Sequence, residues 1–207
     1  MTPFIEIRGK AVPLMMADID TDQMITREFL ITKSRKGLGR GLFHHWRFVD
    51  GKRVEEFPFN WDWAADPQIL IAGSNFACGS SREHAVWSVM DYGFKAVIAP
   101  SFGVHFRRNA YKNGLLPVIL EANEVEHLAE AVTQSRGKQL IHVSLPQQTV
   151  TLDDGPSYRF EIEEEPKAAL LEGLDEIGLT LRHAAAIDAF QKNDAPLRPW
   201  VYLSNDR

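Results

Sequence analysis

Residues 69–100 read ILIAGSNFACGSSREHAVWSVMDYGFKAVIAP. The run 69–73 is continuously apolar, which is typical of a strand buried on both faces of a sheet. Residues 82–91 are predicted to form a helix because their apolar side chains fall on one face, and residues 95–100 repeat the buried-strand pattern. A strand, a helix and a second strand in this order indicate a parallel crossover unit.

The same alternation continues toward the C-terminus. A helix is predicted over 102–112, a strand over 115–120 and a helix over 125–135. Beyond them the apolar period returns to two, which indicates antiparallel strands. The remaining predicted elements are strands at 4–7, 11–16, 141–145, 149–152 and 158–162 and helices at 166–174 and 179–191. The predicted fold class is α/β: a core of strand–helix crossover units with additional short antiparallel strands and C-terminal helices.

The composition is that of an ordinary globular protein. Among 207 residues, 44% are hydrophobic and 25% charged, and 23 basic against 28 acidic side chains leave a net charge of −5. This acidic balance argues against a nucleic-acid-binding protein, which normally has a basic excess. The one cysteine, Cys78, cannot form a disulfide framework or by itself hold an iron–sulfur centre. Since no stretch resembles a signal peptide or a membrane span, we expect a cytoplasmic protein without membrane contact.

The segment DIDTDQMI at 18–25 has the alternating carboxylates of an EF-hand calcium loop. It has no glycine at the sixth position, and Phe29 stands at the twelfth in place of glutamate, so calcium binding is excluded. The segment is predicted to be a polar turn that caps a helix leading to Phe29 and Leu30. The alternative is that it forms the edge of a site.

The basic, glycine-rich segment KSRKGLGRG at 33–41 contains GLGRG, which is superficially similar to a phosphate-binding loop. It lacks the GxGxxG spacing, a preceding strand and a following Lys-Ser/Thr, so a nucleotide site is not favoured. A mobile loop is predicted, because glycine lowers the cost of several backbone states. Its cations could gather a small anion: Lys33, Arg35, Lys36 and Arg40.

The candidate site lies in GSNFACGSSREHAVW, residues 73–87, between a buried strand and a helix. Open α/β sheets bind their ligands at this kind of position. Ser80, Ser81 and Arg82 stand together where the helix is predicted to begin. Free helix N–H groups, two hydroxyls and a guanidinium make a carboxylate-binding constellation.

Two other interpretations of this segment remain open. Ser80 and Glu83 have the S-x-x-E spacing of a capping box, in which both would serve only the helix terminus. A serine hydrolase is less favoured, because its elbow G-x-S-x-G here ends in Glu83 and no histidine has a diagnostic spacing. Cys78 and His84 are predicted to be packed side chains, and neither is favoured as a nucleophile or a base.

The segment CGSSREHA at 78–85 resembles the active-site segment of the aconitase superfamily's swivelling domain. Other segments, in order along nearly the whole chain, are similar to the bacterial 3-isopropylmalate dehydratase small-subunit family: 18–25, Phe29-Leu30, Arg35, 42–43, 46–48, 91–102, 113–118 and 173–183. The chain departs from the family pattern at Ala77, Val86 and Met16, where Gly, Pro and Arg are frequent. Met16 leaves open whether a substrate-binding arginine is missing there.

The resemblance implies a hydro-lyase that isomerises a small hydroxy-diacid by dehydration and rehydration. It implies conversion of 2-isopropylmalate to 3-isopropylmalate through isopropylmaleate, in leucine biosynthesis. It also implies a [4Fe–4S] cluster with one open iron. Because a cluster needs several thiolates and this chain has only Cys78, the cluster would belong to a separate large subunit in a hetero-oligomer.

The resemblance also implies roles for four residues. Ser80 matches the catalytic base, acting as an alkoxide, and Ser81 matches a residue that hydrogen-bonds the substrate. Arg82 would pair bidentately with a substrate carboxylate. Arg35 matches a position connected with substrate selection and would provide a second anionic contact.

The domain organisation expected from the resemblance is a swivelling domain of the β/β/α type over residues 1–162. Residues 163–207 would form a C-terminal helical extension and tail, packed on that domain or on the partner subunit. Two alternative functions remain. The chain could be the small subunit of a related hydro-lyase acting on homoaconitate, citraconate or dimethylmaleate, or a non-catalytic anion-binding module of the same fold.

Overall fold

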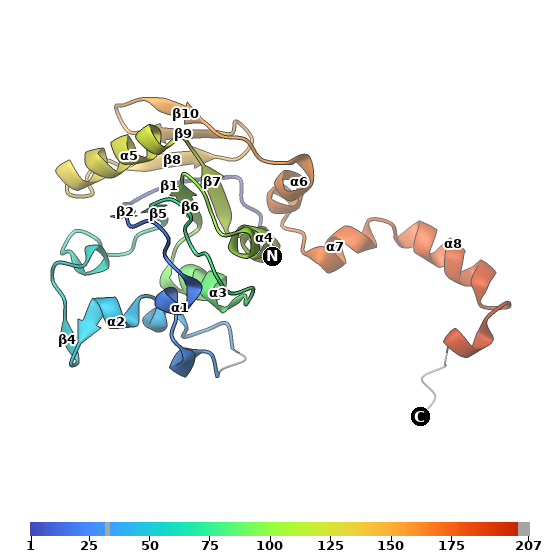
Figure 1. Ribbon diagram of the computed structural model, residues 1–207. Coiled ribbons are helices and arrows are strands. Elements are labelled where there is room, and N and C mark those ends of the chain that lie inside the picture. Colours follow the sequence, from blue (N-terminus) through green and yellow to red (C-terminus); the bar gives the residue numbers. More distant parts are fainter. Residues whose placement is uncertain (32–33, 203–207) are drawn as a thin grey trace.

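A four-stranded parallel sheet forms the centre of the computed structural model, which describes residues 1–31 and 34–202 (Figure 1). Its strands follow the order β2 (Ala11–Leu14), β5 (Ile69–Ala72), β6 (Ala96–Ala99) and β7 (Leu116–Ile119). Helices α3 (His84–Tyr92) and α4 (Val104–Asn113) make the two predicted crossovers. The predicted α/β class with crossover units is therefore confirmed.

Both faces of this sheet are covered, which explains the unbroken apolar run in β5. Ile69 and Ile71 point into one core cluster, and Leu70 and Ala72 point into the other. All four side chains are fully buried. A strand with only one covered face would instead alternate apolar and polar residues.

The first core cluster packs α3, α4 and an aromatic-rich segment, residues 38–64, against one face of the sheet. The sequence pattern does not predict the elements of this segment. It contains several short pieces: the 3-10 helix η2 (Gly39–Gly41), α2 (His44–Arg47), the hairpin β3 (Phe48–Val49) with β4 (Lys52–Arg53), and the 3-10 helix η3 (Pro58–Asn60).

The second core cluster lies under α5 (Ala122–Gln134) and a four-stranded antiparallel sheet (Figure 1). The predicted short antiparallel strands are confirmed, and the ends of each lie within about three residues of their expected positions. The order in this sheet is β1 (Glu6–Gly9), β8 (Ile141–Ser144), β9 (Thr149–Leu152) and β10 (Ser157–Arg159).

The polar turn expected at 18–25 is present and caps a helix, but that helix is a single turn. Asp20 is the N-cap of α1 (Thr21–Met24), and its carboxylate and the Gln23 side chain form a reciprocal capping box. A separate 3-10 turn, η1 (Arg27–Phe29), follows, so no continuous helix leads to Leu30.

The C-terminal helices differ in how they pack. In α6 (Glu164–Glu172), Ala169 and Leu170 are buried against the main body. Neither α7 (Glu176–Leu181) nor α8 (Ala184–Asp194) buries a residue, and both extend away from the sheets (Figure 1). The single helix predicted over 179–191 is wrong, because the chain breaks at Arg182-His183. The division into 1–162 and 163–207 stays a prediction, and residues 203–207 of the expected tail lie outside the described residues. No helix in the described chain is long and apolar enough to cross a membrane.

Candidate active site

The candidate site forms where the carboxyl ends of β2, β5 and β6 meet. The loop after β5 is held to the loop after β2 by three backbone hydrogen bonds: Asp18 N–H to Ser74 O at 2.9 Å, Cys78 N–H to Ile19 O at 3.0 Å and Thr21 N–H to Cys78 O at 2.8 Å. It is held to the loop after β6 by the Gly103 N–H, which donates to Phe76 O at 2.9 Å. This is the sheet edge at which α/β folds bind ligands.

Gly79 lets the Ser80–Arg82 segment approach α1 closely. Its φ of +98° lies in the region that disfavours side chains, and a Cβ there would overlap the Asp20 carboxylate. The turn ends with the Ser80 N–H, which donates to Thr21 Oγ1 at 2.9 Å. The glycine and the capped helix α1 therefore place Ser80 beside Asp22.

Arg82 connects Ser80 to Asp22. Its Nε donates to the Ser80 Oγ at 2.8 Å, and its backbone N–H donates to the same oxygen at 3.3 Å. The Nη2 of the guanidinium pairs with Asp22 Oδ1 at 2.6 Å. The Arg82 and Asp22 side chains are 45% and 56% exposed, so this ion pair is worth only ~0–1 kcal/mol. Replacing Asp22 at Arg82 by another carboxylate would therefore cost little.

The capping-box interpretation of Ser80 and Glu83 is wrong. Helix α3 begins at His84, later than expected, and its N-cap Glu83 makes no side-chain capping bond. The Glu83 carboxylate instead accepts from Asn113 Nδ2 at 2.8 Å. The Ser80 hydroxyl is therefore not needed to terminate the helix and faces Arg82.

Helix α4 supplies two supporting residues that sequence reasoning missed. Asn109 Nδ2 donates to the Ser81 carbonyl oxygen at 2.9 Å, which fixes the loop while leaving the Ser81 side chain exposed. Asn113 bridges Glu83 and the indole N–H of Trp87, which donates to it at 3.0 Å. Their i, i+4 spacing, which places both asparagines on one face of a helix, was the feature of the sequence that could have identified them.

Arg35 lies over α3 and is not in the Ser80–Arg82 cluster. Its guanidinium carbon is 5.0 Å from the centroid of the Trp87 ring, a cation–π contact. The rest of its loop is anchored by the Gly39 N–H, which donates to Asp91 Oδ2 at 2.7 Å. Lys33, one of the four expected cations, lies outside the described residues, and the mobility of the loop stays a prediction.

Cys78 and His84 are packed, as expected. Burial, followed by the carboxylates of Asp20 and Asp18, raises the pKa of the Cys78 thiol, which disfavours the nucleophilic thiolate. The His84 ring lies 4.8 Å from the Trp87 ring centroid. Within the described chain the hydrogen bonds to the Ser80 hydroxyl come from Arg82, so Ser80 has no histidine partner of the hydrolase type.

The chain by itself encloses very little at this site. The hollow lined by Thr21, Asp22, Ser80, Arg82 and His84 has a volume of only about 10 Å³, on the order of one water molecule. Across residues 1–31 and 34–202 no group of three or more His, Cys, Asp or Glu side chains converges to hold a metal ion. With one thiol, the residues of this chain do not fit an iron–sulfur cluster.

Comparison with known proteins gives a consistent result. The family model for the aconitase C-terminal domain matches residues 1–123, and the model for the C-terminal domain of the 3-isopropylmalate dehydratase small subunit matches residues 176–203. The 3-isopropylmalate dehydratase small subunit of Cereibacter sphaeroides is 44% identical, with 97% of this chain and 100% of the relative aligned. That of Agrobacterium fabrum is 43% identical with the same coverage.

A solved structure agrees with these relatives. The crystal structure of 3-isopropylmalate dehydratase from Methanocaldococcus jannaschii matches with a TM-score of 0.65 and 26% sequence identity. The match covers 89% of this chain and 98% of the other.

Proposed function

The chain belongs to the 3-isopropylmalate dehydratase small-subunit family of the aconitase superfamily, and we propose that it is the small subunit of a hydro-lyase that converts 2-isopropylmalate to 3-isopropylmalate in leucine biosynthesis. The reaction removes a proton and a hydroxyl group from neighbouring carbons to give isopropylmaleate. It then returns them in exchanged positions. This chemistry needs a base for a carbon-bound proton and cations for two carboxylates.

The observation that best supports this function is the shared guanidinium of Arg82, which contacts both Ser80 and Asp22. One edge of the fork stabilises negative charge on the Ser80 oxygen, and the other presents N–H groups to a carboxylate. The Arg82 side chain therefore contacts the proposed base and is itself the proposed carboxylate receptor. A hydroxy-diacid bound through Arg82 would present its acidic carbon near Ser80.

Ser80 is the proposed base. A serine alkoxide is unfavourable in water, and it requires fixed positive groups that stabilise the anion. The Arg82 Nε and backbone N–H both point at the Ser80 Oγ, at 2.8 and 3.3 Å. Because these donors are in place before substrate binds, they stabilise the alkoxide without reorganisation.

Ser81 and Arg35 are the proposed additional substrate contacts. The Ser81 backbone is held by Asn109, so its exposed hydroxyl has a defined position next to Ser80. Arg35 rests on Trp87, one turn into α3, and its charge has only a ring face as partner among the described contacts. It is therefore available for the second carboxylate or for selection of the substrate side chain.

A large subunit is the proposed partner, and we assign the [4Fe–4S] cluster to it. The hollow beside Ser80 is too small to enclose a diacid, so the rest of the active site must come from elsewhere. The helices α7 and α8 bury nothing within the chain, and large apolar side chains are exposed along and just after them: Ile177, Leu181, Phe190, Leu197 and Trp200. We propose that these residues are covered by the large subunit, and that the assembled enzyme is cytoplasmic, as suits a biosynthetic dehydratase.

The test is anaerobic co-expression with the large subunit, followed by assay on several hydroxy-diacids. We expect the isolated chain to be colourless and inactive, and the complex to isomerise 2-isopropylmalate with the highest kcat/KM. Preference for homoaconitate, citraconate or dimethylmaleate would assign the chain to a related hydro-lyase. Assembly without activity on any of them would favour a non-catalytic module, and a stoichiometric iron–sulfur absorption band in the isolated chain would contradict the two-subunit proposal.

A further inference from the structure

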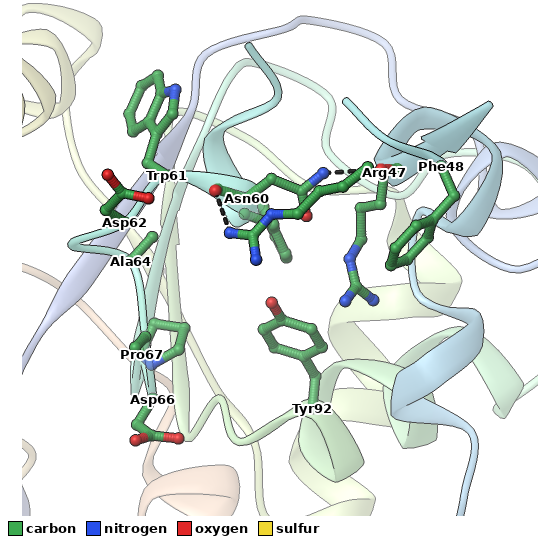
Figure 2. Close-up of a pocket in the computed structure, with 12 residues that line it drawn as sticks. Arg47, Phe48, Asn60, Trp61, Asp62, Ala64, Asp66, Pro67 and Tyr92 are labelled. Carbon is green, nitrogen blue, oxygen red and sulfur yellow. Dashed lines mark hydrogen bonds between the residues drawn. The ribbon is translucent and has the colours of Figure 1, made fainter. Parts of the chain in front are cut away.

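A second cavity lies at the opposite end of α3 from the candidate active site (Figure 2). It has a volume of about 450 Å³ and is bounded by the hairpin β3–β4, the segment 59–67 and Tyr92 at the last turn of α3. Helix α3 has nine residues, which at 1.5 Å each separate the two sites by about 13 Å. The cavity is thus independent of Ser80 and Arg82.

The guanidinium of Arg47 lies in this cavity without a counter-charge. No carboxylate of the described chain lies within 4.0 Å of it, and its Nε is shielded from solvent without a hydrogen-bond partner. Its Nη1 donates to the Leu42 carbonyl oxygen at 3.3 Å, and its other contacts are the ring faces of Tyr92 and Phe48, at 4.9 and 5.2 Å. A partly buried charge left unpaired is costly, so such groups ordinarily have a partner.

A second arginine adds to the positive charge. Burial, and in addition the nearby charge of Arg53, lowers the pKa of Arg47. Arg53 donates to the Asn60 carbonyl oxygen, and its Nε lies 3.8 Å from Glu55 Oε2. The Arg53 and Glu55 side chains are 48% and 68% exposed, so the ion pair between them is weak. The cavity therefore keeps an excess of positive charge near Arg47.

The two arginines are held in a fixed relation by a buried residue. Asn60 is 2% exposed, and its Nδ2 donates to the carbonyl oxygens of Arg47 and Val54, at 2.7 and 2.8 Å. Figure 2 shows the Arg47 guanidinium beside the Tyr92 side chain, both at the cavity. The donors are therefore arranged before any ligand arrives, which reduces the cost of binding.

We propose that this cavity is a binding site for a small oxyanion, a carboxylate or a phosphate, held by Arg47, Arg53 and the Tyr92 hydroxyl. Guanidinium forks bind planar carboxylates and phosphates bidentately, and the phenol is a third donor. Asp62 and Asp66 lie on the side of the cavity away from Arg47 (Figure 2). These acids would repel an extended polyanion, so the ligand is small.

The competing explanation is that the ring faces of Tyr92 and Phe48 alone compensate Arg47. The two explanations differ in whether the buried Nε–H changes its environment when an anion is added. Because this N–H is shielded from solvent, its exchange with water is slow enough for detection by NMR of the ¹⁵N-labelled full chain. The signal of the Arg47 Nε–H is assigned as the one that disappears in the Arg47→Lys variant.

The experiment is a titration of the full chain with inorganic phosphate and, separately, with malonate, at constant ionic strength set by chloride. We expect a saturable shift of the Arg47 Nε–H signal, and the anion that saturates it at the lower concentration identifies the preferred chemistry. Arg53→Met should weaken the affinity by about tenfold or more, as for loss of a charged hydrogen bond. Tyr92→Phe, which keeps the ring, should weaken it less.

Arg82→Met is the matched control, because it removes the proposed carboxylate receptor of the active site. The Arg47 shift should persist unchanged in this variant. The proposal is overturned if neither anion shifts the Arg47 signal, or if the shift disappears in Arg82→Met and persists in Arg53→Met. Since the readout is binding to the isolated chain, it stands or fails independently of the dehydratase activity.

Discussion

The Nε of Arg82 donates to the Ser80 Oγ at 2.8 Å, although only one residue separates them in the chain. Both residues precede helix α3, which begins at His84. Both the Nε and the backbone N–H of Arg82 donate to the Ser80 Oγ. The turn before α3 thus places a fixed cation on the proposed base.

Replacement of Ser80 by alanine tests the proposed base. Since Ser80 is not the helix cap, the loss of its hydrogen bonds should lower stability by only about 0.5–1.5 kcal/mol. Turnover of the assembled enzyme should fall by about 10²–10⁴-fold, with KM nearly unchanged. Ser74→Ala, in the same loop, is the control and should keep full turnover, because the contact of Ser74 with Asp18 uses its carbonyl oxygen. Near-normal turnover of Ser80→Ala with the cluster intact would rule out Ser80 as the base.

Replacement of Arg82 by lysine tests the carboxylate receptor. Lysine keeps the charge but loses the planar fork, so KM should rise by about 10- to 100-fold. Because Arg82 also contacts Ser80, kcat should fall as well. Asp22→Asn provides the contrast, since it weakens only the competing ion pair, and its KM should stay the same or decrease. Steady-state kinetics that separate kcat from KM decide this, and unchanged kinetics in Arg82→Lys would make Arg82 a structural residue.

The role of Arg35 can be separated from the general charge of its loop. Arg35→Met should raise KM by about 2- to 10-fold, from the loss of one contact worth about 0.5–1.5 kcal/mol. Arg40→Met changes the charge equally, but Arg40 lies in the 3-10 helix η2 and has no cation–π contact with Trp87 among the described residues, so KM should not change. If both variants raise KM equally, the loop attracts substrate only through its net charge.

The exposed C-terminal helices are tested by Phe190→Glu. Phe190 is 60% exposed and lies in a helix with no buried residue, so the melting temperature of the isolated chain should not change. Binding of the large subunit should weaken by at least about tenfold, since buried aromatic residues are frequent hot spots. Gln191→Glu adds the same charge at the next position and is the control. Equal elution with the large subunit for wild type and Phe190→Glu would contradict the proposed interface.

The thiol of Cys78 should be slow to react at neutral pH. Its pKa lies above the ordinary value of about 8.5 because of burial and the carboxylates of Asp20 and Asp18. Since only the thiolate reacts, the rate of alkylation by iodoacetamide should rise about tenfold per pH unit up to that raised pKa. In denaturant the midpoint should return to about 8.5. A folded-state midpoint at or below that value would show that these neighbours do not control the thiol.

The central architecture could be predicted from local pattern. The strands β5, β6 and β7 are fully or nearly fully buried on both faces, and such burial leaves unbroken apolar runs that can be recognised within a few residues. The alternation in β9 is recognisable for the corresponding reason, since one of its faces is only half-buried. Segment 38–64 gave no comparable signal, because its aromatic residues are spaced by contacts with the sheet and follow no helical or strand period.

The residue types of the candidate site were also visible in the sequence, but their partners were not. Ser80 and Glu83 have the spacing of a capping box, but contacts with distant residues decide the outcome. Arg82 pairs with Asp22, 60 residues away. Glu83 accepts from Asn113, 30 residues away. The pairing of Arg47 with the Tyr92 ring and the absence of a described carboxylate beside it likewise depend on distant segments. Local periodicity reports which face of an element is buried, because burial acts on every residue of that face. Polar contacts between single side chains leave no such periodic mark, so only the folded chain reveals them.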